Sequence, residues 1–412
     1  MKTKGLILIL LLTASQFAMA QTPDITGFAR NYTGVLFDNG DFSILQNTLN
    51  LDISKSGNKV AFKANPMLYS YNDDSLDLRF RELYLDLYFD NFDLRIGKQQ
   101  VVWGKADGVF ITDIVSPLNL TEFLLPDFDE IRTGVNAVKF DYYKGNSTFE
   151  LIWLPNFTPT VTPAAGSIWY IQPDFPATPT FDRTKSEVKP SLENSELFVK
   201  YSALTSKIDF ELMGGYTWDD NPTMHTEKQL EISTGSPILT GIKITPEHHR
   251  LNIAGGSFST EIKGFVIRGE AAYYNGKYFQ TEDPLAMDAL VKKDYLHYLI
   301  GVDFSIKDIK FSTQFIQEAI LDYDDSMLNE EMENTMTFVA RYDMFRETMH
   351  LELFSYIGLT NADALIRPKV TYDFDDSFSI LLGSNIFVGD EKGRFGQYKD
   401  NSMIYAKIKY NF

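Results

Sequence analysis

The sequence of 412 residues contains no cysteine and only five histidines. Without thiols, the chain has neither a disulfide framework nor a thiolate metal site. Basic residues are also scarce, since 38 Lys and Arg stand against 56 Asp and Glu, and the net charge is −18. This charge argues against nucleic acid, whose phosphates would be repelled, and it fits a protein that meets cations. No stretch beyond the first twenty residues is apolar enough for a transmembrane helix.

The first twenty residues have the three parts of a secretory signal peptide. Lys2 and Lys4 form a positive region, residues 5–12 are apolar, and residues 18–20 read Ala-Met-Ala, a small-residue cleavage pattern. The apolar run is shorter than the ~20 residues that a spanning helix needs. We therefore predict a signal peptide over residues 1–20, followed by an exported chain over residues 21–412.

Aromatic residues are abundant, with 32 Phe and 22 Tyr. Several stretches alternate between apolar and polar residues over ten or more positions. In 265–273, one face holds Phe265, Ile267, Gly269, Ala271 and Tyr273, and the other holds Arg268 and Glu270. In 366–374, one face holds Ile366, Pro368, Val370, Tyr372 and Phe374, and the other holds Arg367, Lys369, Thr371 and Asp373. This pattern is typical of transmembrane barrel strands, because strands of soluble sandwiches are usually ~5–6 residues long.

The connections between these stretches alternate between short and long. Short turns such as "SKSGNK" (54–59) and "YKGNS" (143–147) alternate with long segments, which include 105–131, 156–192 and 219–247. Bacterial barrels have short periplasmic turns and longer extracellular loops. The alternation predicts an all-β fold: a transmembrane antiparallel β-barrel of about 16–18 strands, with 156–192 and 219–247 as long extracellular loops.

The final stretch, "MIYAKIKYNF", has Tyr410 and the terminal Phe412 on its apolar face. A terminal aromatic residue in this position resembles the signal that the barrel-assembly machinery reads. We therefore expect the Gram-negative outer membrane as the location. The expected partners are that machinery, outer-membrane lipid and lipopolysaccharide.

Residues 105–131 are unusual for an exposed loop, because many of their side chains are apolar and two prolines interrupt them. A barrel of ~16–18 strands leaves an aqueous lumen unless something narrows it. Folded inward, these side chains could pack against the barrel wall, and we predict an in-folded constriction loop. The alternative is an outward loop that packs against neighbouring loops or lipid headgroups.

Charged residues on and near this loop suggest a pore lining. The candidate constriction residues are Arg79, Arg81, Arg95, Trp103, Asp107, Asp113, Asp127, Asp129, Glu130 and Arg132. Wall arginines opposite loop acids would create a transverse field that tunes selectivity. Alternatively, these arginines simply pair with neighbouring acids. The alternation slips near Glu82 and near Lys98, and a β-bulge there would re-aim the side chains.

The same region resembles a known family. "LRIGKQQVVWGKADG", followed by "IVSPLNL" and "LLPDFDEIRTGVNAV", is similar to an uncharacterised bacterial outer-membrane β-barrel family with a Gly-[Arg/Lys]-Gln…Trp-Gly motif. The matching positions are Arg95, Gly97, Lys98, Gln99, Trp103, Gly104, Pro117 and Asn119. Members are often encoded beside RND-type exporters. The resemblance implies a broadly porin-like barrel, and possible work with an inner-membrane exporter in moving lipid-like molecules.

An enzyme is not expected, because no Gly-x-Ser-x-Gly elbow is present. The adjacent His248 and His249 would point to opposite faces of a strand, so they do not predict a shared metal site. We expect no cofactor. The sequence therefore predicts a channel that moves solutes passively across the outer membrane. One alternative is a conduit for hydrophobic or lipid-like molecules that works with an RND-type exporter. Another is a surface-exposed binding or adhesive barrel.

Overall fold

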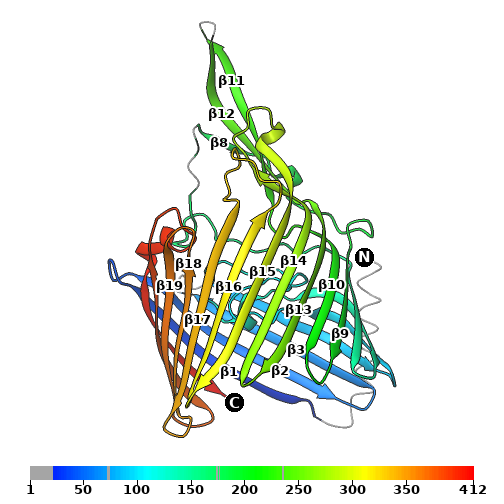
Figure 1. Ribbon diagram of the computed structural model, residues 1–412. Coiled ribbons are helices and arrows are strands. Elements are labelled where there is room, and N and C mark those ends of the chain that lie inside the picture. Colours follow the sequence, from blue (N-terminus) through cyan, green and yellow to red (C-terminus); the bar gives the residue numbers. More distant parts are fainter. Residues whose placement is uncertain (1–21, 72–74, 173–174, 176, 234–235) are drawn as a thin grey trace.

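The computed structural model describes residues 22–71, 75–172, 175, 177–233 and 236–412, so the predicted signal peptide lies outside the described residues. Eighteen strands form one antiparallel sheet, and pairing of β1 with β21 closes it into a barrel (Figure 1). The predicted barrel is confirmed, at the upper end of the expected strand number. Its strands are β1 Asp24–Leu36, β2 Phe42–Ser56, β3 Val60–Tyr71, β4 Leu76–Tyr88, β5 Phe92–Gln99, β6 Val135–Lys144, β7 Ser147–Leu154, β9 Glu196–Leu204, β10 Asp209–Trp218, β13 Arg250–Ile262, β14 Phe265–Gln280, β15 Leu290–Ile306, β16 Ile309–Ile320, β17 Met332–Met344, β18 Met349–Gly358, β19 Asp363–Asp373, β20 Phe378–Val388 and β21 Met403–Asn411.

The two faces of the strands follow the predicted alternation. On β21, Ile404, Ile408 and Tyr410 are exposed on the outside, whereas Lys407 points inward and contacts Asp127. The pattern agrees with burial here, because the outward-facing side chains are apolar, whereas the lumenal face carries Lys407 together with the buried Met403 and Tyr405.

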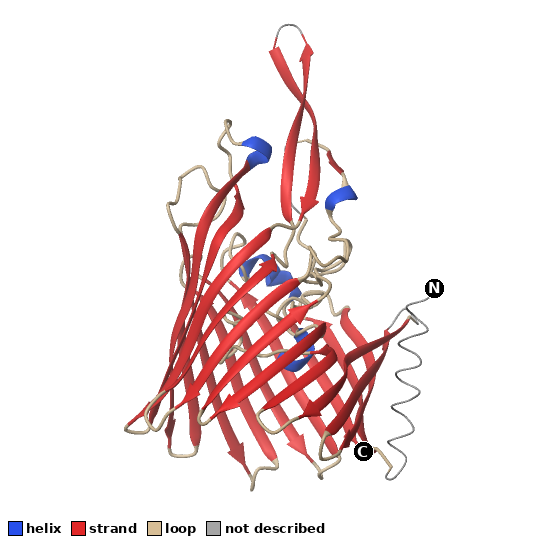
Figure 2. Cartoon of the chain, turned by 90° about the vertical axis from the view of Figure 1, so that its right-hand side faces the viewer, coloured by secondary structure: helices blue, strands red, loops and turns tan. Residues whose placement is uncertain are grey.

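The height of the wall varies around the barrel. β14 and β15 have 16 and 17 residues, whereas β5 and β7 have only 8 each. The chain leaves the top of β5 and enters the lumen rather than continuing upward. In Figure 2, loops and short helical turns accordingly lie within the ring of strands.

A bulge interrupts the pairing of β3 with β4. Asn65 pairs with Glu82 and Pro66 with Phe80, so Arg81 is an extra residue without a partner in the ladder. The bulge confirms the predicted slip near Glu82, and it turns Arg81 and Glu82 to the same side of the wall. Near Lys98, by contrast, the β4–β5 ladder runs without a shift.

Residues 219–247, expected to be a long extracellular loop, contain a hairpin of β11 Thr223–Ser233 and β12 Ser236–Glu247. β12 pairs in parallel with the short β8, Pro179–Phe181. The hairpin stands above the barrel (Figure 1). Its pattern differs from a membrane strand because Glu227 and Lys228 are charged at successive positions, so that a charge lies on each face.

The described part of the chain has one short α-helix, α2 Phe128–Ile131, and three 3₁₀ turns, η1 Arg183–Lys185, η2 Met287–Ala289 and η3 Gly396–Asn401. None of the helices in the described ranges is long and apolar enough to cross a membrane. Much of the apolar core lies inside the barrel. Ile111, for example, is fully buried and packs against Leu299 and Ile316 of the wall.

Candidate functional site

The candidate site is the segment of residues 105–131, called the inserted segment below, together with the lumenal wall that it contacts. The segment begins where β5 ends. Trp103 lies beyond the end of β5 at Gln99, and its side chain is buried against Phe198 of β9. Its indole N–H donates to Glu150 of β7. The chain has therefore turned inward before the inserted segment starts.

Asp113 ties the two ends of the inserted segment together. Its Oδ1 accepts hydrogen bonds from the backbone N–H of Trp103 at 2.6 Å and of Gly104 at 2.9 Å. Its Oδ2 accepts from Arg132, with Nη2 at 2.5 Å and Nε at 3.1 Å. The Arg132 guanidinium also lies 5.0 Å from the centre of the Phe110 ring. These contacts satisfy a buried carboxylate and close the segment into a loop.

On the far wall, the segment is held mainly through its backbone. Tyr356 of β18 donates its hydroxyl to the carbonyl of Gly108 at 2.7 Å. Arg367 of β19 donates to the carbonyls of Leu124 and Leu125 at 3.0 and 2.7 Å. A Cβ at Gly108 would lie 2.4 Å from the Phe354 ring, so glycine is required for this approach.

Ion pairs hold the segment to three further parts of the wall. Asp107 pairs with Arg268 of β14, Asp127 with Lys407 of β21 at 3.1 Å, and Glu130 with Arg30 of β1. Together with the contacts to β18 and β19, these pairs place the inserted segment against strands all around the lumen.

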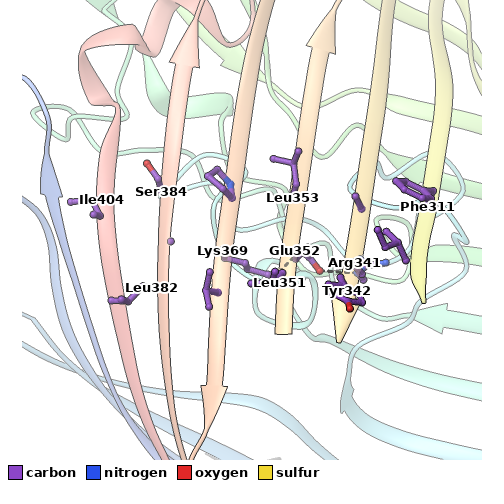
Figure 3. Close-up of a pocket in the computed structure, with 15 residues that line it drawn as sticks. Phe311, Arg341, Tyr342, Leu351, Glu352, Leu353, Lys369, Leu382, Ser384 and Ile404 are labelled. Carbon is purple, nitrogen blue, oxygen red and sulfur yellow. Dashed lines mark hydrogen bonds and ion pairs between the residues drawn. The ribbon is translucent and has the colours of Figure 1, made fainter. Parts of the chain in front are cut away.

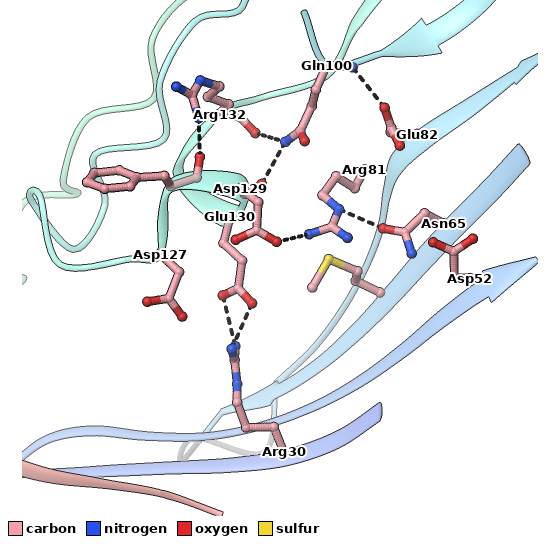
Figure 4. A network of polar contacts seen from close by, with 12 residues as sticks. Arg30, Asp52, Asn65, Arg81, Glu82, Gln100, Asp127, Asp129, Glu130 and Arg132 are labelled. Atoms are coloured by element: carbon pink, nitrogen blue, oxygen red, sulfur yellow. Dashed lines mark hydrogen bonds and ion pairs between the residues drawn. The ribbon is translucent and has the colours of Figure 1, made fainter. Parts of the chain in front are cut away.

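The helix α2 connects this ring to β4. Asp129 accepts a hydrogen bond from Arg81 at 2.9 Å, and Arg81 also donates through Nε to Asn65 at 2.7 Å (Figure 4). Gln100 donates to the carbonyls of Asp129 and Arg132. In Figure 4, the carboxylates of Asp129 and Glu130 extend toward different arginines of the wall.

Two carboxylates of the inserted segment differ in their acidity. Burial raises the pKa of Asp127, but the charge and hydrogen bond of Lys407 outweigh it, and the pKa falls to about 2. The Glu122 carboxylate has no hydrogen bond or ion pair within the described part of the chain. Burial therefore dominates there and raises its pKa to about 7, against the weaker opposing charge of Lys407.

The predicted constriction residues form two groups in the structure. Arg81, Asp107, Asp113, Asp127, Asp129, Glu130 and Arg132 belong to the contacts between the inserted segment, its ends and the wall. Arg79 and Arg95 instead pair with wall acids, namely Asp77 at 2.5 Å and Asp86 at 2.7 Å. Arg79 and Arg95 thus pair with neighbouring acids of the wall, whereas Arg81 pairs with Asp129 of the inserted segment.

Sequence reasoning did not include Arg30, Arg268, Arg367 and Lys407 in the site. The signal was present for the last three, since each lies on the polar face of an alternating stretch. The sequence did not show which residues of the inserted segment these side chains contact, because the contacting residues are up to 280 positions apart along the chain.

An aromatic cluster joins the inserted segment to two other loops. The Phe123 ring lies 4.6 Å from that of Tyr398 and 6.1 Å from that of Phe395. Trp169, from the long segment after β7, joins the cluster with its ring 5.7 Å from Tyr398. Residues from three loops thus meet on the inner side of the barrel.

A separate pocket lies on the wall between β16 and β21 (Figure 3). Its lining includes Leu382 and Ile404, which are on the outer, exposed face of their strands. The pocket therefore faces away from the lumen, and it is not part of the candidate site.

Comparisons with solved structures show the fold. OccK10 (OpdN) of Pseudomonas aeruginosa has a TM-score of 0.54 and 9% identity, over 95% of this chain and 99% of that chain. OccK2 (OpdF) of the same organism, solved in complex with glucuronate, has a TM-score of 0.54 and 8% identity, over 95% and 97%. OccAB1 of Acinetobacter baumannii has a TM-score of 0.53 and 8% identity, over 96% and 98%. No curated protein matched the chain.

A family model described as "Protein of unknown function (DUF1302)" matches residues 50–412. The match covers nearly all of the barrel, including the inserted segment. The chain therefore belongs to the DUF1302 family, and its fold is an outer-membrane-type β-barrel that resembles porins.

Proposed function

We propose that the protein is a passive channel of the outer membrane, and that the inserted segment narrows its lumen. The observation that carries this proposal is the ring of contacts from the segment to β1, β4, β14, β18, β19 and β21. A wide barrel without such a segment would hold an open aqueous lumen. Solutes then pass beside the segment without a cofactor.

The ion preference is proposed to be for cations. The chain carries a net charge of −18, and most acids of the inserted segment are neutralised by wall arginines or lysines. Glu122 is the exception, because it has no ion pair within the described residues. Its charge adds to the negative potential that a permeating cation meets.

The test is single-channel conductance in a planar bilayer under a salt gradient. The double variant Asp127→Asn/Glu130→Gln removes the ion pairs to β21 and β1 and leaves the barrel strands intact. We expect larger conductance with frequent substates, because the segment can move away from the wall. A variant lacking residues 106–130 should conduct more than either protein.

The control is Glu352→Gln, which breaks lumenal pairs with Arg341 and Lys369 that do not involve the inserted segment. Its conductance should stay at the level of the unchanged protein. Absence of conductance in every form, with the barrel folded by circular dichroism, would contradict a channel.

A second candidate function is a surface-binding barrel. The β11–β12 hairpin favours it, because this hairpin projects above the barrel. Removing residues 223–247 should leave conductance unchanged and abolish binding to an external surface. Cooperation with an RND-type exporter stays a prediction from the family resemblance.

A further inference from the structure

The barrel wall has a step between β4 and β5. β4 has 13 residues, but its ladder with β5 covers only Leu83 to Tyr88. Within the described ranges, residues 76–82 of β4 pair on one side only, with β3. One edge of this stretch therefore has no strand beside it, although the barrel is closed elsewhere.

The step lies within the membrane. A strand of 8 residues, as in β5, rises about 21 Å at ~3.4 Å per residue and a ~40° tilt. The apolar band of such barrels is about 25 Å tall, so β5 ends below its upper limit. On the open stretch of β4, Leu76, Leu78 and Phe80 face outward and are exposed by 70%, 63% and 39%. These apolar side chains indicate lipid outside the edge.

Side chains close the gap beside this edge. Arg81 pairs with Asp129 of α2, and the backbone N–H of Gln100 donates to Glu82 at 3.3 Å (Figure 4). Gln100 also donates from its side chain to the carbonyls of Asp129 and Arg132, as described above. We call these contacts the seam. It joins the wall to the inserted segment without a backbone ladder.

Such a seam is easier to open than a ladder. The Asp129 side chain is 67% exposed and that of Arg81 is 19% exposed, and ion pairs with an exposed partner contribute little. A backbone ladder in lipid must stay closed, because each unpaired group there is costly. Gly134 lies directly against the Arg81 carbonyl, where a Cβ would approach to 2.2 Å. Gly134 and the bulge thus let the two sides meet closely without a ladder between them.

On the lumenal side, the open edge adjoins a surface that is partly aromatic and partly charged. The Arg79 guanidinium lies 5.4 Å from the centre of the Tyr69 ring, and Tyr69 pairs in register with Asp77 on β4. A molecule that crosses the seam would leave apolar Leu78 and Phe80 and meet this mixed surface. An apolar chain with a polar head matches both sides.

We propose that the seam between β4 and the inserted segment is a lateral portal between the lumen and the outer leaflet. Its substrate class is single-chain amphiphiles dissolved in that leaflet. The inference rests on the proposed function only in placing the inserted segment inside the lumen. Asp129 and Arg81 hold the portal closed, and their separation admits the alkyl chain.

The test uses the absence of native cysteine. In proteoliposomes, a single cysteine reports whether hexadecyl methanethiosulfonate, dissolved in the bilayer, reaches its position. The reporter is Arg79→Cys, on the lumenal face of the open edge. Leu78→Cys, on the outer face of the same edge, is the positive control and should be labelled completely. Thr371→Cys, on the lumenal face of β19 with pairing on both sides, is the control that the membrane reagent must not reach.

We expect the membrane reagent to label Arg79→Cys and not Thr371→Cys. Intact-mass spectrometry measures the labelled fraction. Adding Asp129→Asn should raise the labelling rate of Arg79→Cys severalfold. Adding Asp86→Asn should leave it unchanged, because that substitution breaks the Arg95 pair in the fully paired part of β4 and β5. A water-soluble trimethylammonium methanethiosulfonate reagent reports access from the aqueous side.

Three results would overturn the portal. In the first, Arg79→Cys is labelled by the water-soluble reagent alone or by neither reagent. In the second, the membrane reagent labels Thr371→Cys as fast as it labels Arg79→Cys. In the third, Asp129→Asn leaves the labelling rate of Arg79→Cys unchanged. Conductance measured on the same samples separates the two proposals. Conductance without labelling by the membrane reagent would support the channel and contradict the portal. Labelling without conductance would support the portal and contradict the channel.

Discussion

Arg30 and Glu130, 100 residues apart in the sequence, form a two-pronged ion pair inside the barrel. Nη1 lies 2.7 Å from Oε1 and Nη2 lies 2.9 Å from Oε2, and the Arg30 side chain is only 6% exposed. This geometry is the one that guanidinium and carboxylate groups favour. It fixes α2 to β1, the strand that closes the barrel.

The Arg30–Glu130 pair yields a stability prediction. Glu130→Gln should lower the free energy of unfolding by about 3 kcal/mol, because it leaves a buried guanidinium without its counter-charge. The measurement is reversible urea unfolding in detergent micelles. Adding Arg30→Gln should recover much of the loss, since the uncompensated charge is then gone. A double variant as unstable as the sum of the single ones would show that the two side chains do not interact.

Glu122 yields a prediction about pH and ion preference. Its pKa of about 7 means that the carboxyl is mostly protonated below that pH and charged above it. Cation preference, measured as the reversal potential under a salt gradient, should therefore increase as the pH rises from 6 to 8. Glu122→Gln should remove this change. If the cation preference of Glu122→Gln changes by the same amount between pH 6 and 8, another group causes the change.

The same carboxyl affects stability with a defined sign. Its pKa is raised from 4.5 in the unfolded chain to about 7 in the folded one. The folded state then binds the proton more tightly, so this group's contribution is present at acid pH and is lost as the pH rises to about 7. Glu122→Gln should therefore be more stable than the unchanged protein at pH 8 and similar to it at pH 4.

Gly108 yields a prediction about packing. Its φ is +79°, and a Cβ would collide with Phe354 and with the Tyr356 hydroxyl. Gly108→Ala should destabilise the protein by more than about 1 kcal/mol, through both backbone strain and the collision. Gly166→Ala is the matched control, because φ there is +88° and nothing lies within 4 Å. If Gly108→Ala and Gly166→Ala lose the same free energy of unfolding in urea, the collision with Phe354 and Tyr356 does not contribute to the loss.

The terminal aromatic residue yields a prediction about assembly. Phe412 exchanges two backbone hydrogen bonds with Gly27, at 2.9 and 3.0 Å, and its side chain is half exposed on the outer face. Phe412→Ala keeps those backbone bonds. If the side chain is the assembly signal, the folded protein in the outer membrane should fall severalfold, as shown by heat-modifiable migration. Phe374→Ala, an exposed aromatic at a turn, should leave the level unchanged.

Alternation along the chain was enough to predict the strands and their lipid faces. Arg268, Arg367 and Lys407 all point into the lumen, as the polar face of each stretch indicated. The period of a strand is two, so a local pattern carries this information. The bulge at Arg81 was also visible as a slip of phase.

Pairings across the lumen could not be obtained in this way. Arg95 and Asp129 both looked suited to a pore lining, yet Arg95 pairs with Asp86 on the adjacent strand and Asp129 with Arg81. The choice among several acids depends on which part of the inserted segment lies at which height in the barrel. Local periodicity does not contain that height.

By itself, the sequence determined the class of fold, the approximate number of strands and the direction of most charged side chains, because each follows from a repeat of two residues in lipid. Only the tertiary structure decided the course of the inserted segment, the ion pairs that hold it and the one-sided edge of β4. Those features depend on contacts between residues far apart in the chain, and on differences in strand length that become visible only when neighbouring strands are paired.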